Sequence, residues 1–246
     1  MKLLVCISKA PDTTSKIAFA NGNTSFDEAG VTFIVNPYDE WYALVRALEL
    51  KEAQGGSVTV ISVGGSDYEQ IIRKALAIGA DDAVRIDAPE TDALSVAKHI
   101  ADYAKDQGFD LILTGKETIN YNGSLVPGMI AEMLNLPLVA LASKLDVSGS
   151  LATCEREIAG GVEVLEVTLP AVISAAKGMA EQRIPNMKGI MSARTKPLQV
   201  ITPAAVEANT SVQNFEMPPA KGACKFIAPE NAAELIQLLH TEAKVI

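Results

Sequence analysis

"VTVISVGGSDYEQIIRKALAIGADDAVRI", residues 58–86, holds an apolar run, a helical pattern and a second apolar run. The two runs, "VTVISV" and "AVRI", are rich in β-branched residues, which is typical of strands buried on both faces of a sheet. The residues between them, from Ser66 to Ile78, predict a helix. A strand, a helix and a strand in this order indicate a parallel pair with a right-handed crossover.

The same alternation continues on both sides of this stretch. "LLVCI" at 3–7 and "DLILT" at 110–114 are further strand-like runs, and helices are expected at 91–106 and at about 127–134. The pattern predicts an α/β fold with a doubly wound, mainly parallel five-stranded sheet of the Rossmann-like kind.

The clearest helix signal is "NPYDEWYALVRALELKEAQGG", residues 36–56. Asn36 is a suitable N-cap and Pro37 suits the first helical position. Asp39 and Glu40 put negative charge in the first turn, where the helix dipole favours it, and Gly55 is expected to end the helix.

The pattern of apolar residues changes in the C-terminal half. From Leu138 onward, hairpin-like runs with Ser-Gly and Gly-Gly turns predict antiparallel additions to the sheet. Residues 202–229 show little periodicity, and residues 230–246 predict one amphipathic helix. We expect residues 1–195 to form the α/β domain and residues 196–246 to form an extended arm that packs on something else.

Composition narrows the classes of function. The 246 residues carry a net charge of −9, which argues against a nucleic-acid partner, and the apolar runs fall short of the roughly 18 residues that membrane insertion needs. The three cysteines, Cys6, Cys154 and Cys224, are widely spaced and predict a reduced, cytoplasmic protein. Neither histidine stands in a catalytic or metal-binding pattern, so we expect no metal.

The position of the loops predicts where a ligand binds. In an open parallel sheet, ligands lie outside the carboxyl ends of the strands, near the point where the strand order reverses. That rule selects the loops after Ile7, before Asn36, after Val63 and after Thr114. The last of these, "GKETINYNGSLVPG", leads into a helix whose free N–H groups could hold a phosphate; a plain polar connection is the alternative.

The sequence offers no set of catalytic side chains. There is no G-x-G-x-x-G after the first strand, and Gly115-Lys116 lacks the spacing of a P-loop. No pair of carboxylates and no Ser-His-Asp order stands out either. The chain is therefore expected to bind rather than catalyse, with any difficult chemistry supplied by a cofactor.

Five segments, in this order, resemble the β subunit of electron-transfer flavoproteins. They cover roughly residues 1 to 200 and are "SKAPDTTSKI", "NPYDEWYALVRALELKE", "RKALAIGADDAVRI", "LTGKETINYNGSLVPGMIAEML" and "REIAGGVEVLEVTLPAVISA". The resemblance implies an electron carrier without a catalytic residue set of its own. It also implies a heterodimer with a larger α subunit, one FAD shared with that subunit, and AMP buried as a structural nucleotide in the β subunit. Residues 1–195 would then be an adenine-nucleotide-binding domain, and the arm 196–246 would pack on the partner subunit.

Further implications concern electron donors and acceptors. Members of the family take electrons from flavin dehydrogenases, such as acyl-CoA dehydrogenases, and pass them to a quinone oxidoreductase or another acceptor. In electron-bifurcating members, a second FAD replaces the AMP, and this alternative stays open. Another alternative is a homodimeric ATP- or AMP-binding protein similar to universal stress proteins, which share this kind of sheet.

The resemblance also assigns residues to two sites. Cys6 and Val63 are expected to contact the nucleotide through their backbone, with plain core packing as the alternative. The expected nucleotide-binding residues are Cys6, Asn36, Pro37, Tyr38, Asp39, Val63, Thr118, Ile119, Asn120, Tyr121, Asn122, Gly123, Ser124, Leu125, Val126, Pro127, Gly128 and Met129.

A second site is expected in the basic stretch 176–200, where five Lys and Arg side chains stand against Glu181 alone. The family's recognition loop for dehydrogenases falls here, and its apolar anchor aligns with Met187. The residues expected to dock partners are Met187, Lys188, Ile190, Met191 and Arg194.

Overall fold

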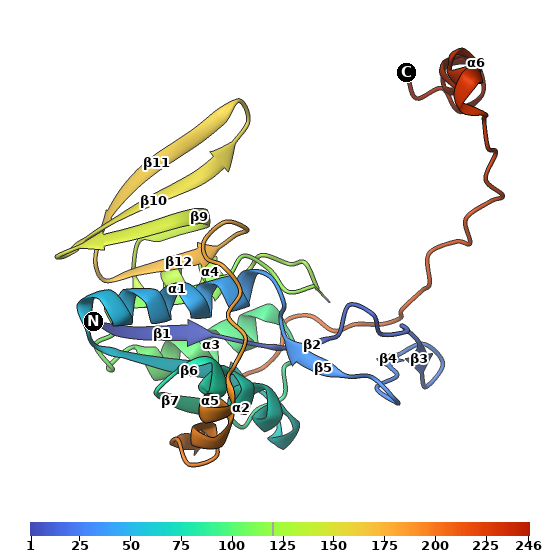
Figure 1. The fold of residues 1–246 in the computed structure, drawn as a ribbon. Helices are drawn as coiled ribbons and strands as arrows, with labels where there is room; N and C mark the ends of the chain where they lie inside the picture. Colours follow the sequence, from blue (N-terminus) through green and yellow to red (C-terminus); the bar gives the residue numbers. More distant parts are fainter. Residues whose placement is uncertain (120) are drawn as a thin grey trace.

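The structure is a computed structural model that describes residues 1–119 and 121–246. A nine-stranded sheet forms its centre, with the strand order β11-β10-β9-β12-β8-β1-β6-β7-β13 in the described residues (Figure 1). The strands, in the order of the sheet, are β11 (Gly161–Thr168), β10 (Leu151–Ile158), β9 (Leu138–Ser148), β12 (Ala171–Ala175), β8 (Leu111–Gly115), β1 (Lys2–Cys6), β6 (Ser57–Val63), β7 (Asp82–Ile86) and β13 (Leu198–Ile201).

The sheet is larger than the five strands expected from the sequence. The strands from β13 to β9 in that order run parallel, and only the pairs β9–β10 and β10–β11 are antiparallel. The expectation that the runs after Leu138 are all antiparallel is therefore wrong for β12. The chain leaves the β10–β11 hairpin and returns to insert β12 between β8 and β9, a long-range pairing that local sequence patterns do not encode.

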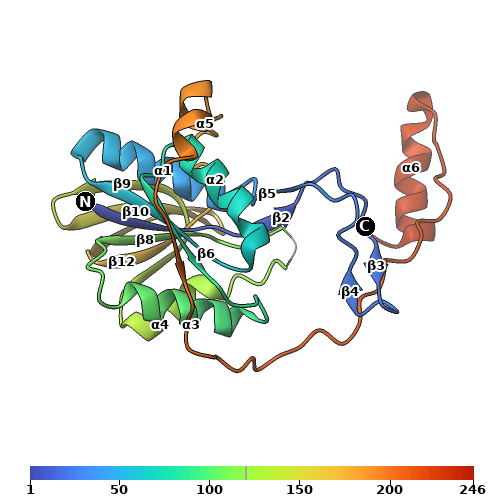
Figure 2. The ribbon, with the colours of Figure 1, turned by 90° about the horizontal axis from the view of Figure 1, so that it is seen from below.

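Helices cover both faces of the sheet, as expected for a doubly wound fold. α1 (Asp39–Gln54) and α2 (Glu69–Ile78) pack on one face, where Leu44 and Ile72 are fully buried against β1 and β6. α3 (Ala93–Ala104) and α4 (Val126–Leu134) pack on the other face, where Ile130 belongs to the same buried cluster as Leu4 of β1 and Ile61 of β6 (Figure 2). The strands β1, β6, β7, β8 and β12 are thus buried on two sides, which explains why they read as continuous apolar runs.

The start of α1 differs from the sequence expectation. The helix begins at Asp39 after Tyr38, and Asn36 does not cap it. Instead, Asn36 Nδ2 donates a hydrogen bond of 2.9 Å to the carbonyl oxygen of Glu117, in the loop after β8. The helix ends at Gly55, as expected, with a φ of 76°.

Gly115 allows this end of α1 to approach the sheet closely. A Cβ atom at Gly115 would lie 2.8 Å from Glu40 Cγ and 3.0 Å from Glu40 N. Both distances are below normal contact, so only glycine lets the last residue of β8 touch the first turn of α1. The loops after β1 and β8 are brought together at this point.

The segment between β1 and α1 forms two small ladders outside the main sheet. β2 (Lys9–Pro11) pairs with β5 (Phe33–Val35), and β3 (Phe19–Ala20) pairs with β4 (Ser25–Phe26). The runs "KIAFA" and "VTFIV", on either side of an Asn-Gly turn, predict an inserted hairpin in which the two runs pair. The run "VTFIV" pairs instead with the residues just after β1, and only the two-residue β3–β4 ladder flanks the Asn-Gly turn.

The basic stretch contains a short helix before the last strand of the sheet. α5 (Met187–Ala193) packs on α2, and β13 pairs in parallel with β7. A Cβ atom at Gly189 would lie 2.3 Å from the carbonyl oxygen of Ala77, so a glycine is needed where the two helices touch. The short turn at Ser66–Tyr68 precedes α2.

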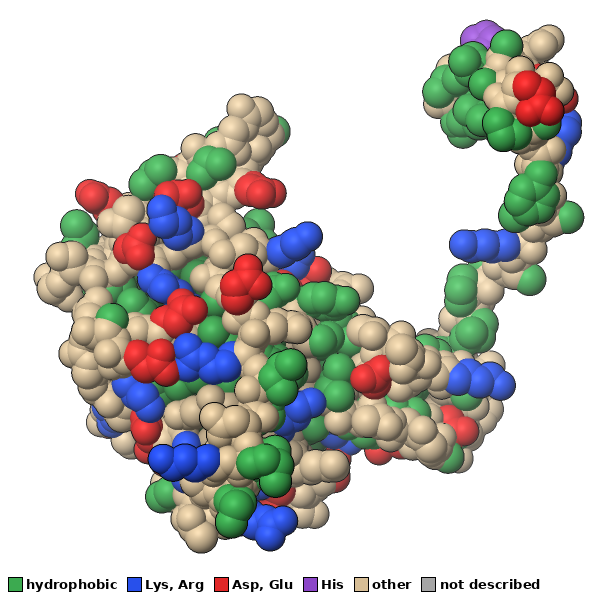
Figure 3. Space-filling model, viewed as in Figure 1, with side chains coloured by type: hydrophobic (Ala, Val, Ile, Leu, Met, Phe, Trp, Pro, Cys, Tyr) green, Lys and Arg blue, Asp and Glu red, His purple; other side chains and the backbone are tan. Residues whose placement is uncertain are grey.

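The C-terminal residues leave the body after β13. Figure 2 shows them running past α3 toward β3 and β4, and Figure 1 shows them continuing to α6 (Ala232–Leu238), which stands apart from the sheet. A turn at Pro229–Asn231 precedes α6, and a further turn at Leu239–Ala243 extends it. In the space-filling view, open space separates the outer part of this arm, with α6, from the body (Figure 3). No helix in the described part of the chain has the length and apolarity to cross a membrane.

Candidate functional site

A cavity of about 490 Å³ lies at the carboxyl ends of the central strands. This volume falls within the range of roughly 300–1,000 Å³ that small-molecule sites occupy. Its walls come from the loops after β1, β6, β7 and β8, from the starts of α3 and α4, and from the arm. The described lining residues are Cys6 to Lys9, Glu40, Val63, Glu90 to Ala93, Val96, Ile100, Thr114 to Thr118, Tyr121, Gly123 to Pro127 and Thr210 to Val212.

The strand order explains why the cavity forms here. The chain builds β1, β6 and β7 successively toward one edge, and then crosses back to place β8 on the other side of β1. The connections on the two sides of this reversal leave the sheet over opposite faces. They therefore separate and open a crevice at the strand ends, which is the position the sequence rule selected.

The start of α4 lies at the cavity without a side-chain cap in the described residues. Residues Gly123 to Pro127 line the cavity. Ser124 has a φ of 52°, a left-handed conformation that turns the loop just before the helix. An uncapped helix N-terminus attracts anions through its free N–H groups and through the helix dipole.

Thr114 adds a buried hydroxyl without a partner. Its side chain is 3% exposed, it lines the cavity, and Oγ1 has no hydrogen-bond partner among the described residues. An unsatisfied buried polar atom costs roughly 1–3 kcal/mol, so proteins keep one chiefly where something else satisfies it. A polar group of a ligand in the cavity could form that bond.

Glu40 forms a buried wall of the cavity. Its carboxyl group accepts hydrogen bonds from Ser8 N at 2.7 Å and from Ser8 Oγ at 2.8 Å. Burial raises the pKa of Glu40 to about 8, against the lowering effect of the two Ser8 bonds. Glu40 is therefore mostly a neutral acid at pH 7. Burial also raises the pKa of the Cys6 thiol, with Glu40 contributing.

Other acidic side chains near the cavity form hydrogen bonds or ion pairs, or have a raised pKa. Tyr68 donates a hydrogen bond to Glu90, and burial raises the pKa of Glu90. Lys9 pairs with Asp67 at 2.6 Å. Burial raises the pKa of Asp39 to about 6. Glu40 and Glu90 therefore repel a bound anion less than two fully ionised carboxylates would.

The cavity brings together half of the residues expected to bind a nucleotide. Thr118, Tyr121 and the run Gly123 to Pro127 line it, as do Cys6 and Val63. The lining does not include Asn36, Pro37, Tyr38, Asp39, Ile119, Asn122, Gly128 or Met129, which flank it in sequence, and Asn120 lies outside the described residues.

Sequence reasoning missed three parts of the lining. The first is the loop after β7 with the start of α3, from Glu90 to Ala93; its position at a strand end was the available signal. The second is Glu40 with Thr114, whose approach depends on Gly115. The third is the arm at Thr210 to Val212. The sequence has no signal for it, because Thr210 contacts Asp92, which is 118 positions earlier in the chain.

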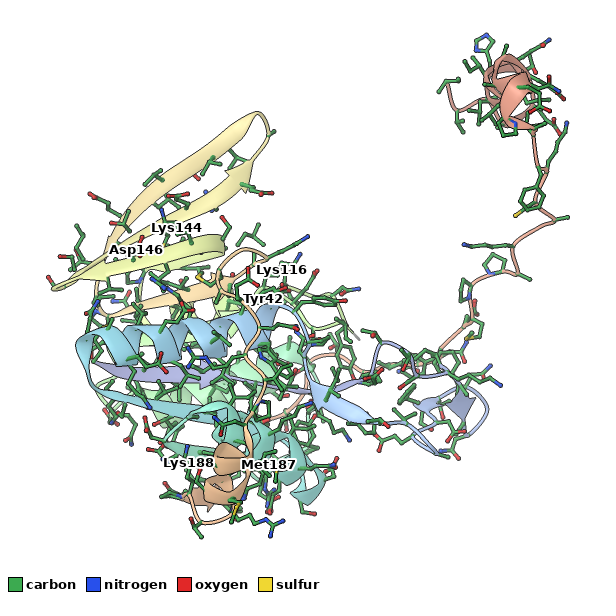
Figure 4. All side chains as sticks on the ribbon, viewed as in Figure 1. Tyr42, Lys116, Lys144, Asp146, Met187 and Lys188 are labelled. Atoms are coloured by element: carbon green, nitrogen blue, oxygen red, sulfur yellow. The ribbon has the colours of Figure 1, made fainter. Side chains whose placement is uncertain are left out.

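A separate surface lies on α5, where the docking residues were expected. Met187 and Met191 are 73% and 69% exposed, and Ile190, Lys188 and Arg194 are exposed beside them. Figure 4 shows Met187 and Lys188 on α5, well away from Tyr42 and Lys116 at the cavity end of α1 and β8. Ile184, 85% exposed, precedes this helix and was not among the expected residues.

Two basic side chains fix α5 on the body. Arg73 Nη1 donates hydrogen bonds of 2.7 Å to the carbonyl oxygens of Ala193 and Lys196. Lys196 Nζ donates to the carbonyl oxygens of Leu76 and Ala80, at the C-terminal end of α2, where the helix dipole favours a cation. The apolar side chains of α5 are therefore presented on a rigid support.

The described residues contain no group of three or more His, Cys, Asp or Glu side chains that could hold a metal ion. His99 is buried in α3, and His240 is bonded near the C-terminus to the carbonyl oxygen of Ile246. Neither histidine lines the cavity.

Comparison with known proteins gives consistent matches over most of the chain. Residues 23–206 match the family model described as the electron transfer flavoprotein domain. A protein of Bacillus subtilis (strain 168) named electron transfer flavoprotein subunit beta is 38% identical over 260 residues, covering all of both chains. Proteins of the same name from Syntrophomonas wolfei and Dictyostelium discoideum are 39% and 31% identical, covering 91% and 96% of this chain and 88% and 97% of theirs.

The raised pKa of Glu40 predicts how stability depends on pH. In the unfolded chain Glu40 ionises near its ordinary pKa of 4.5, whereas in the fold it ionises near 8. Between these values the folded state binds the extra proton, so Glu40 makes the free energy of unfolding fall as pH rises, by at most about 1.4 kcal/mol per pH unit. Above pH 8 the contribution is constant.

Glu40→Gln removes this titration while keeping one acceptor and one donor for Ser8. Urea unfolding of both proteins at pH 5, 6, 7, 8 and 9 should show the variant gaining stability relative to the wild type up to about pH 8 and then levelling off. A difference that stays constant from pH 5 to 9 would show that Glu40 is already ionised in the fold.

Proposed function

The chain belongs to the electron transfer flavoprotein β-subunit family, and we propose that it relays electrons as one half of a heterodimer with an α subunit. In this proposal, one FAD is shared with the α subunit, and flavin dehydrogenases such as acyl-CoA dehydrogenases supply the electrons. A quinone oxidoreductase or another acceptor receives them. The FAD supplies the redox chemistry when bound, and this chain supplies binding surfaces.

The cavity at the strand ends supports an adenine nucleotide in this subunit, and this is the observation that carries the proposal. Phosphate oxygens would accept hydrogen bonds from the free N–H groups at the start of α4, and Thr114 Oγ1 would gain a partner. Val63, Val96 and Ile100 form an apolar wall that suits a flat base. We propose AMP as a structural nucleotide, with a second FAD of a bifurcating protein as the alternative.

The described lining residues suit binding better than catalysis. The raised pKa of Cys6 keeps its sulfur as a thiol, which is a poor nucleophile. Glu40 is held by Ser8, and Glu90 by Tyr68. We therefore propose that this subunit is an electron carrier without a catalytic residue set of its own.

The arm supports a role in joining the two subunits. Its exposed apolar side chains include Met217, Phe226, Ile236 and Ile246, and Phe226 is 92% exposed. A segment that reaches away from its own body with apolar side chains uncovered is suited to packing on a partner. Of the expected arm, residues 196–246, Leu198–Ile201 form β13 of the sheet, and the residues beyond Phe215 are proposed to pack on the α subunit of a cytoplasmic complex. A free-standing homodimer of the universal-stress kind gives this arm no partner.

Coexpression with the α subunit encoded by the same source tests the main proposal. The two chains should copurify in a one-to-one ratio as a yellow complex, because the shared FAD needs both subunits. Flavin absorbance per heterodimer is the measurement, and each chain expressed alone is the control. A stable one-to-one complex that lacks flavin after purification in the presence of FAD would contradict the electron-carrier role.

The surface on α5 is proposed to dock the donor dehydrogenase. Met187 is a flexible apolar side chain on a rigid support, and Lys188 and Arg194 beside it can attract an acidic partner.

Met187→Ala should raise the KM of the complex for its donor dehydrogenase about tenfold, as loss of an apolar anchor commonly does. Flavin content and thermal stability should stay unchanged, because the side chain is exposed. Met133→Ala, which truncates an exposed methionine on α4, is the matched control. Equal KM values for the two variants would place the docking site elsewhere.

A further inference from the structure

The arm closes one side of the cavity before it leaves the body. Thr210, Ser211 and Val212 line the cavity directly. They approach it from more than eighty residues beyond the other lining residues in the sequence, and Figure 2 shows this part of the arm passing α3 on its way to β3 and β4. Thr210 to Val212 lie in a segment that is not part of the sheet.

Asp92 holds one end of this segment. Its Oδ1 accepts a hydrogen bond from Ser95 N at 2.8 Å and so caps α3. Its Oδ2 accepts from Asn209 N at 2.7 Å and from Thr210 N at 3.1 Å. The bonds from Ser95, and with them those from Asn209 and Thr210, lower the pKa of Asp92, so the carboxylate stays ionised and acts only as an acceptor.

Phe215 holds the other end. Its ring stacks on Phe19 with a centroid distance of 4.9 Å and an interplanar angle of 13°. Its backbone N donates a hydrogen bond of 2.8 Å to the carbonyl oxygen of Asn23, in the turn between β3 and β4. Neither Phe19 nor Phe215 lines the cavity, so this attachment acts on the arm alone.

Residues 209–215 are thus fixed at both ends and lie over the cavity between them. We propose that they form a strap that retains the bound nucleotide, with Asp92 as the residue that latches it and Phe215 as its second attachment. The proposal rests on the proposed nucleotide in the cavity. A ligand enclosed in this way leaves only when the strap detaches, so the latch controls the rate of release.

Release also becomes linked to the partner. Beyond Phe215 the arm continues into the segment proposed to pack on the α subunit, and its side chains are mostly exposed in the single chain. Packing of that segment on a partner would hold the strap in place, because the two are continuous in the chain. Nucleotide exchange is therefore expected to be slow in the heterodimer.

Asp92→Asn separates the two roles of Asp92. The amide oxygen can still cap α3, since Asn is as good an N-cap as Asp. The amide N–H₂ group replaces the second acceptor, and it cannot accept the hydrogen bonds that Asn209 N and Thr210 N donate. Asp102→Asn makes the same charge change on an exposed position of α3 and is the control. Phe215→Ala loosens the far end without touching either the cavity or the cap of α3.

The experiment uses the copurified heterodimer loaded with etheno-AMP, a fluorescent AMP analogue. Its release is followed after addition of excess AMP, and hydrogen exchange of residues 209–215 is measured by mass spectrometry. Asp92→Asn and Phe215→Ala should each release the analogue roughly tenfold faster, the effect of losing about one good interaction, with faster exchange of the 209–215 amides. Asp102→Asn should match the wild type in both measurements.

The remaining outcomes each overturn a defined part of the account. If Asp92→Asn speeds release and Phe215→Ala does not, Asp92 acts by touching the ligand, and the strap is wrong. If neither variant speeds release from a complex that binds the analogue, the strap is wrong and the nucleotide site stands. If the wild-type complex binds neither AMP nor the analogue, the proposed nucleotide fails and the strap fails with it.

Discussion

The close contact between the end of β8 and the start of α1 is the constraint on which the site depends. Gly115 has no Cβ, so Glu40 can lie directly against the last residue of the strand. From that position Glu40 holds Ser8 after β1, and Asn36 holds the loop after β8 through Glu117. Two loops that leave the sheet on either side of the strand reversal are thereby set in fixed positions around one cavity.

This contact also explains the unusual chemistry of the cavity. A carboxyl group placed in the crevice loses most of its hydration, and its pKa rises until it is neutral near pH 7. Glu40 therefore places little negative charge in the cavity at pH 7. The uncapped start of α4 and the hydroxyl of Thr114 suit a ligand that carries its own negative charge.

Much of this arrangement follows from the sequence, and the exceptions have physical causes. The alternation of "VTVISV", the helix at α2 and "AVRI" specified the parallel core, and the strand-end rule located the cavity. The insertion of β12 between β8 and β9 was not predicted, because pairing partners are chosen by long-range packing. The start of α1 was misplaced at Asn36, because a residue with good capping chemistry bonded instead to a distant loop. The strap contacts at Asp92 and Phe215 join segments that only the fold brings together.

The central claim is that the crevice at the strand ends holds a nucleotide that is separate from the shared FAD. Its most direct test is mass spectrometry of the small molecules released when the purified heterodimer is denatured, quantified per complex. The account predicts one FAD together with one further adenine nucleotide, AMP for a simple carrier or a second FAD for a bifurcating protein. One FAD with no second nucleotide, from a complex that is active in electron transfer, would contradict it.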